Sequence, residues 1–263
     1  MTDSANSNLF ASTAWYYAQY RPTYGERALE FLQERFALSS DSKVLDLGSG
    51  PGTIAIPLAE YVGEVVAIDP NEEMIAEGKA EAERIGADNV DWVIGSDEDI
   101  DDNSGPFTVT TIGRAFHWMD QERTLERLYP ITEPGGGLVL VGEGDWVWSP
   151  SKNWQRVVKR TVQDWLGEER RAGDDSFDPP EKRYEQMICE SEFSGPRKTE
   201  FTFKRSWDVD SVVGYLYSTS YCSPSLVGDQ KAEFESDLRE RLADFDEDGL
   251  VQDVTLEFMV ARK

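Results

Sequence analysis

The chain has 263 residues, which is enough to bury one sizeable hydrophobic core with a small cap. Asp and Glu number 51 against 26 Lys and Arg, so the formal net charge is −25. Nucleic acids are bound by clustered Lys and Arg, which this sequence lacks, so we expect no nucleic-acid partner. No apolar run is long enough to cross a membrane as a helix, and we expect no membrane partner.

Two explanations fit the acidic charge. One is an acidic patch for a cationic partner, and the other is a whole surface adapted to high salt, which screens repulsion between carboxylates. Because the acids are scattered along the chain, we expect salt adaptation. Two cysteines, Cys189 and Cys222, without metal-like spacing, and a polar start at 1–8 without a signal-peptide core, predict a reducing cytoplasm.

An aromatic segment precedes the first regular element. One Trp and four Tyr fall within residues 15–24, too many for an ordinary surface. The segment, about 9–25, is either a lid packed on the core or a flap over a bound ligand. Apolar residues at helical spacing then predict a packing helix over 26–36.

A strand, a glycine-rich turn and a helix follow. Residues 44–47 are apolar, the turn is Asp46-x-Gly48-x-Gly50-x-Gly52, and residues 53–62 have a helical pattern. This is the opening of a nucleotide-binding α/β unit. The dinucleotide fingerprint is G-x-G-x-x-G instead, and Asp46 at the carboxyl end of the strand suits a cationic group better than a pyrophosphate.

The next strand, 64–69, ends in a second acid. Asp69 stands 17 positions after Gly52, where doubly wound folds use an acid to hold ribose hydroxyls. Asn71 is a suitable N-cap for the helix predicted over 71–85, so Asp69 is not needed for capping. Strands are then predicted over 90–94 and 107–112.

Past residue 112 the loop 113–118 contains His117, the only histidine, beyond a strand end where ligands bind in α/β sheets. It is either a hydrogen-bonded structural residue or a base near the reacting atoms. The remaining elements are predicted as follows: helices at 120–129, 153–166, 181–193, 209–218 and 229–245, a turn at 133–137, and strands at 138–142, 199–207 (with Phe201 and Phe203 inward) and 254–260.

On these residues the chain resembles the class I S-adenosylmethionine-dependent methyltransferases. The resemblance covers roughly residues 12–145, and the run Ala115-Phe116-His117-Trp118-Met119-Asp120 is similar to the small-molecule branch that includes trans-aconitate-type enzymes. It implies an α/β fold: a Rossmann-like, doubly wound, seven-stranded sheet with an antiparallel C-terminal edge hairpin and helical insertions. The whole chain, 1–263, would be one domain with its core at 26–145 and 196–263, the aromatic flap at 9–25 and a helical insertion at 149–195.

The resemblance also implies a cofactor, S-adenosyl-L-methionine, and a set of site residues. In relatives the loop after the third strand holds the adenine, and here the partner of its amine is either Ser96 or Asp97. Met74 either lies near the adenine or is plain core. The implied cofactor contacts are Arg21 (to the methionine carboxylate), Asp46, Gly48, Ser49, Gly50, Gly52, Asp69, Pro70, Met74, Ser96, Asp97 and Arg114.

Methyl transfer to a small-molecule acceptor is the reaction this implies. His117 and Tyr20 are the candidate catalytic residues, with Tyr16 as an alternative to Tyr20 beside the acceptor. Aromatic faces would attract the sulfonium, and the oligomeric state and acceptor atom stay open. Two alternatives remain: an NAD-type oxidoreductase sharing the first β–α–β unit, and a non-catalytic protein that binds an adenosyl cofactor.

Overall fold

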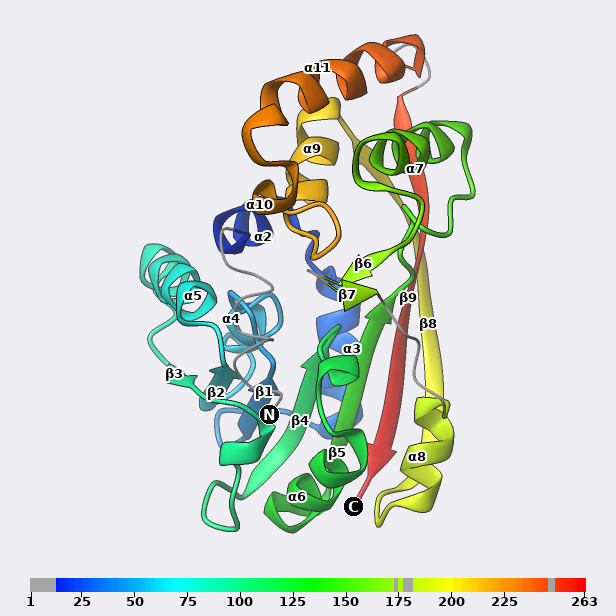
Figure 1. Ribbon diagram of the computed structural model, residues 1–263. Helices are drawn as coiled ribbons and strands as arrows, with labels where there is room; N and C mark the ends of the chain where they lie inside the picture. Colours follow the sequence, from blue (N-terminus) through cyan, green and yellow to red (C-terminus); the bar gives the residue numbers. More distant parts are fainter. Residues whose placement is uncertain (1–12, 173–174, 177–181, 246–248) are drawn as a thin grey trace. The chain divides into compact units, whose positions relative to one another are not determined.

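The computed structural model describes residues 13–172, 175–176, 182–245 and 249–263 (Figure 1). The polar start 1–8 and the first four residues of the aromatic segment therefore lie outside the described residues. The chain divides into two compact units. We call 22–142, 180–201 and 256–263 the sheet unit, and 1–21, 143–179 and 202–255 the helix-rich unit. The expected core, 26–145 and 196–263, thus contributes residues to both.

The main sheet has seven strands in the order β3-β2-β1-β4-β5-β9-β8 (Figure 1). Adjacent strands among β3, β2, β1, β4 and β5 pair in parallel, and the C-terminal strands are antiparallel members. The order reverses direction between β1 and β4, the switch point at which doubly wound sheets bind ligands. The predicted fold class is confirmed. The bounds are β1 Lys43–Leu47, β2 Glu64–Asp69, β3 Val90–Ile94, β4 Phe107–Gly113, β5 Thr132–Glu143, β8 Ser194–Trp207 and β9 Leu250–Arg262.

Both faces of β1 and of the inner parts of β4 and β5 are buried, because alternate side chains enter different cores. Val44, Val139 and Val141 pack with α3 (Glu26–Phe36) and α4 (Ala55–Leu58). Leu45 and Leu138 point the other way, into a core with α6 (Gln121–Ile131) and α8 (Tyr184–Glu190). This explains why the strand sequences are nearly continuous apolar runs.

Helix α5 (Glu72–Ile85) confirms the expected cap. The Asn71 side chain accepts a hydrogen bond from the N–H of Met74 at 3.0 Å. Asp120 caps α6 in the same way, accepting from Arg123 N at 3.4 Å. In each case the polar residue that precedes the helical pattern of apolar residues is the N-cap of the helix.

Two elements of the sheet unit differ from expectation. The helix expected over 53–62 is only the four residues of α4. Ile56 N donates to Gly52 O at 3.0 Å, but Pro57 has no N–H to make the next helical bond, to the Thr53 carbonyl. The expected turn 133–137 lies inside β5, where the register jumps between the pairs Phe107–Thr132 and Val109–Gly137.

Helices dominate the other unit. Its core joins α7, α9 and α11 through buried side chains that include Trp154, Leu216 and Phe234. Asp208 caps α9 by accepting from Ser211 N at 2.7 Å. The expectation for Phe203 is wrong: it is 37% exposed. The elements are α2 Ala14–Tyr20, α7 Asn153–Leu166, the pair β6 Arg171–Ala172 and β7 Asp175–Ser176, α9 Val209–Tyr217, α10 Pro224–Val227 and α11 Lys231–Leu242.

Strand β3 is the outer strand at one end of the sheet. Its last two side chains, Val93 and Ile94, are 37% and 55% exposed. Among the described residues, no helix is both long and apolar enough to cross a membrane.

Candidate functional site

The glycine turn after β1 uses its backbone N–H groups within the protein. Gly48 N and Ser49 N both donate to the Ile68 carbonyl, at 2.8 and 3.0 Å, and Gly52 N donates to Ser49 O at 3.0 Å. Gly50 N donates to the Asp69 carboxylate at 2.8 Å, and Pro51 has no N–H. A pyrophosphate cradle needs N–H groups aimed at the ligand, so this turn is not arranged as one.

Side chains cannot replace the glycines at either end of this turn. Gly48 and Gly52 have φ of +68° and +80°. A Cβ on Gly48 would lie 2.4 Å from Ala115 Cβ, and one on Gly52 would lie 2.5 Å from Cη2 of Trp92. The turn therefore packs directly against the loop after β4, which carries His117, and against the Trp92 side chain of β3.

Asp69 joins the ends of β1 and β2. Besides the bond to Gly50 N, its Oδ1 accepts from Asn71 N at 2.9 Å. Burial raises the pKa of this carboxyl, while the two N–H donors partly offset the shift. The sequence placed this acid correctly at the strand end, and the structure adds that it holds the turn.

Asp46 is 1% exposed at the end of β1. Its Oδ1 accepts from the Thr111 hydroxyl of β4 at 2.8 Å, and its Oδ2 accepts from Ala55 N, at the start of α4, at 3.0 Å. Desolvation raises its pKa to about 7, with the Asp69 charge as a smaller cause, against the lowering effect of the two hydrogen bonds. The Asp69 charge is close enough to affect Asp46, so both predicted acids lie near the same turn.

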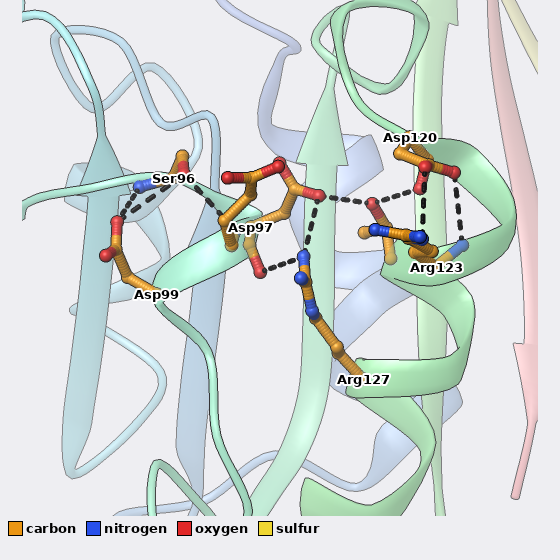
Figure 2. A network of polar contacts seen from close by, with 8 residues as sticks. Ser96, Asp97, Asp99, Asp120, Arg123 and Arg127 are labelled. Atoms are coloured by element: carbon orange, nitrogen blue, oxygen red, sulfur yellow. Dashed lines mark hydrogen bonds and ion pairs between the residues drawn. The ribbon is translucent and has the colours of Figure 1, made fainter. Parts of the chain in front are cut away.

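The loop after β3 ends in the 3₁₀ turn Asp97–Asp99 (Figure 2). Ser96 is half-buried and caps that turn, accepting from Glu98 N at 3.2 Å. Asp97 is buried, and its carboxylate accepts from the Thr124 hydroxyl of α6 at 2.8 Å. The two candidates for the adenine contact thus have different surroundings.

The loop after β4 brings two more predicted residues beside the turn. Arg114 has φ +56°, and its Nε donates to the Tyr24 hydroxyl at 2.9 Å. His117 is half-buried within the 3₁₀ turn Phe116–Trp118, with its ring centroid 4.6 Å from that of Trp118. Gly48, Ala115 and His117 therefore belong to one contiguous arrangement at the carboxyl ends of β1 and β4.

Met74 and Pro70 flank the end of β2. Met74 is 3% exposed, in the first turn of α5, and Pro70 is exposed directly after Asp69. Met74 thus has the burial expected of a core residue, one of the two roles considered for it.

Tyr20 and Arg21 belong to the helix-rich unit. The Tyr20 ring lies on Gly214 of α9, where a Cβ would come within 2.2 Å of the ring. Arg21 Nε donates to Ser218 Oγ at 2.8 Å, and its guanidinium lies over the Tyr215 ring, 4.6 Å from the centroid. Within their own unit, both residues connect the aromatic segment to α9.

Comparison with known families finds a similarity for the region around the turn. Residues 44–136 match the sequence model of a family described as methyltransferase domain. The matched stretch begins in β1, carries both acids and the His117 loop, and ends in β5. Over these residues the chain is similar to a methyltransferase domain.

Curated relatives agree with this assignment over part of the chain. An uncharacterized methyltransferase of Mycobacterium tuberculosis is 34% identical over 134 residues, which are 50% of this chain and 51% of the relative. An uncharacterized methyltransferase of Schizosaccharomyces pombe is 29% identical over 126 residues, 48% of each chain. The chain thus matches about half the length of these curated relatives.

Solved structures share the fold more widely. A putative type II methyltransferase from Anaeromyxobacter dehalogenans has a TM-score of 0.57 at 21% identity, covering 92% of this chain and 97% of its own. The YcgJ protein of Bacillus subtilis has a TM-score of 0.56 at 16% identity, covering 90% and 98%. At these identities the comparison establishes the fold alone.

Sequence reasoning missed two residues that hold predicted site residues. Thr111 donates to Asp46, and Tyr24, 5% exposed, accepts from Arg114. In the sequence Thr111 is only one of several β-branched residues of a predicted strand, and nothing there indicates a contact with Asp46. Tyr24 was visible as part of the aromatic segment, but its partner is 90 positions away.

Proposed function

We propose that this protein is a methyltransferase that moves a methyl group from S-adenosyl-L-methionine to a small-molecule acceptor by in-line displacement. The observation that carries the proposal is the joining of Asp69 to Gly50 at the end of β2, beside the His117 loop. The match of residues 44–136 to a methyltransferase domain supports it.

The residues around the turn fit an adenosyl cofactor. Asp69 would accept hydrogen bonds from the ribose hydroxyls, and the bare backbone of Gly48, Gly50 and Gly52 would lie against the ligand. Asp46 is buried beside the turn, and in its ionised form its carboxylate would favour a positively charged ligand. Pro70, Met74 and either Ser96 or Asp97 are the proposed adenine contacts, while Arg114 and Arg21 are further proposed contacts.

When bound, the sulfonium supplies an already activated methyl group. The protein then has mainly to hold the acceptor atom in line with the methyl carbon, which can lower the barrier by several kcal/mol. His117 is the proposed base for an acceptor atom that carries a proton, and a carboxylate acceptor needs none. Tyr20 is the proposed acceptor contact.

The donor pattern of the turn disfavours the oxidoreductase alternative. The N–H groups of residues 48, 49, 50 and 52 donate hydrogen bonds to oxygens of the protein. In a dinucleotide-binding turn, backbone N–H groups donate to the pyrophosphate instead. The non-catalytic alternative has no observation in its favour beyond the site it would share.

The choice of acceptor class rests on charge. A chain with a net charge of −25 repels phosphate backbones, which supports a small molecule over a nucleic acid. Adaptation to high salt and a cytoplasmic location are parts of the same proposal, and rest on the scattered acids and the two cysteines.

Calorimetric titration in multimolar salt tests the cofactor. We expect S-adenosylhomocysteine to bind and NAD not to bind, and the reverse result would favour the oxidoreductase. Incubation with methyl-labelled donor and a panel of small acids, phenols and amines then tests transfer. Binding of the cofactor with no labelled product from any acceptor class would favour the non-catalytic alternative.

A further inference from the structure

The loop after β3 is braced internally on one side. Asp99 Oδ2 accepts from Ser96 N at 2.8 Å, and Ser96 Oγ accepts from Glu98 N at 3.2 Å. These bonds span at most three residues, so they shape the loop (Figure 2) but do not connect it to the rest of the fold.

Asp97 makes that connection through α6. Its Oδ2 accepts from the Thr124 hydroxyl at 2.8 Å and lies 3.5 Å from Nη1 of Arg127. The same Arg127 nitrogen donates to the Asp97 backbone carbonyl at 3.1 Å. Figure 2 shows the carboxylate directed toward Arg127. Helix α6 therefore holds both the side chain and the backbone carbonyl of Asp97.

Burial strengthens the contacts of Asp97 with Thr124 and Arg127. The side chain of Asp97 is 11% exposed, that of Arg127 is 29% exposed, and Thr124 is fully buried. An ion pair away from bulk water is screened less than one on the surface. A carboxylate buried in this way has to keep its partners, because leaving it unpaired carries the full desolvation penalty.

Helix α6 begins immediately after the His117 loop. Asp120 caps its first turn, and the Thr124 hydroxyl oxygen also lies 2.8 Å from the Asp120 carbonyl oxygen, so its one proton is shared between Asp97 and Asp120. The contacts of Asp97 therefore tie the loop after β3 to the helix that ends the loop after β4.

We propose that Asp97 is a positioning residue, clamped by Thr124 and Arg127, that fixes the loop presenting Ser96 to the adenine. The inference rests on the proposed function, since the loop takes an adenine only if an adenosyl cofactor binds. It assigns the base-facing polar group to Ser96 and the loop itself, and it gives Asp97 no direct contact with the base.

Amide hydrogen exchange on the protein without cofactor tests the clamp. Arg127→Met removes the charge and the donors, and Thr124→Val removes only the hydroxyl, while Thr124→Ser retains it. We expect about three- to tenfold faster exchange at residues 96–99 in the first two variants and wild-type rates in the third. The matched control is Arg123→Met: Arg123 is exposed, lies on the same helix and pairs with Asp120 (Figure 2). Exchange at wild-type rates in both test variants would overturn the clamp.

Titration with S-adenosylhomocysteine and S-inosylhomocysteine tests the role of Asp97. We expect Asp97→Ala, Arg127→Met and Thr124→Val each to weaken adenosyl binding by about three- to tenfold, and to reduce discrimination against the inosyl ligand. Combining Asp97→Ala with Arg127→Met should add little, because both remove one clamp. If Asp97→Ala alone lowers affinity, Asp97 contacts the base directly and the proposal is wrong. If the wild type binds neither ligand, the proposed function fails, and the exchange experiment still decides whether the clamp exists.

Discussion

The carboxylate of Asp69 accepts a hydrogen bond from the backbone N–H of Gly50, 19 positions earlier in the chain, at 2.8 Å. One acid thus closes β2 and holds the glycine turn after β1, and we propose that it also binds the ribose. Loss of this carboxylate should affect ligand binding through both the sugar contact and the shape of the turn.

We expect Asp69→Ala to weaken S-adenosylhomocysteine binding by about 1–3 kcal/mol, the usual loss for a hydrogen bond to a charged group. Titration calorimetry in high salt measures the change. Glu72→Gln is the control, because Glu72 is an exposed acid three residues later in the first turn of α5. Unchanged affinity in Asp69→Ala would exclude its ribose role.

Asp46 should make stability depend on pH. Its pKa is about 7 in the folded protein, against the ordinary value of 3.8 that applies in the unfolded chain. Between these two pH values the folded state binds a proton that the unfolded state releases. The resulting stabilisation is fully present below pH about 4 and is lost as the pH rises to about 7, at up to about 1.4 kcal/mol per pH unit.

Asp46→Asn should remove this contribution. Urea unfolding at several pH values compares the variant with the wild type, and the difference between them should vary between pH 4 and 7 and be constant above. Asp41→Asn, at an exposed acid, controls for the change in net charge. A difference between Asp46→Asn and wild type that does not vary with pH would mean that Asp46 does not titrate in this range.

High salt should stabilise the fold. At a net charge of −25, screening of carboxylate repulsion lowers the free energy of the compact state. Each kcal/mol gained raises the Tm by about 2–4 °C for a chain of this size. Melts in sodium chloride and in sucrose of equal osmolarity separate screening from general exclusion effects. Equal Tm values at low and multimolar salt would contradict salt adaptation.

The contact between Tyr20 and Gly214 should tolerate no added methyl group. Gly214→Ala would push the ring away from α9, and we expect a loss of about 1–3 kcal/mol in the free energy of unfolding. In a Tyr20→Ala background the same substitution should be neutral or stabilising by up to about 1 kcal/mol, because Ala favours helix. Urea unfolding of the two single variants and the double variant measures the coupling. Additive effects would mean that the ring does not rest on Gly214.

Local patterns predicted most of the fold. Strands β2 and β3 and helices α3 and α7 begin and end where the apolar periodicity places them, and Asn71, Asp120 and Asp208 lie at helix starts. These signals work because each depends on neighbours within one or two turns. The glycine turn and both acids were found for the same reason.

The partners of those residues could not be predicted. Thr111 meets Asp46 across 65 positions and Arg114 meets Tyr24 across 90, so only the folded sheet brings them together. Phe203 has the alternation of a buried strand residue, yet it is partly exposed because burial in a strand depends on what covers its face. Pro57 was visible in the sequence, and its missing N–H is the signal that could have shortened the predicted helix.

The outer strand β3 has a consequence for self-association. Its unpaired edge ends in the exposed Val93 and Ile94, the kind of apolar strand edge that recruits a strand from a second copy. In dilute buffer, repulsion between two strongly anionic molecules keeps such edges apart. At about 1 M salt that repulsion reaches only about 3 Å. High salt would therefore stabilise the folded chain and, at the same time, favour association between chains.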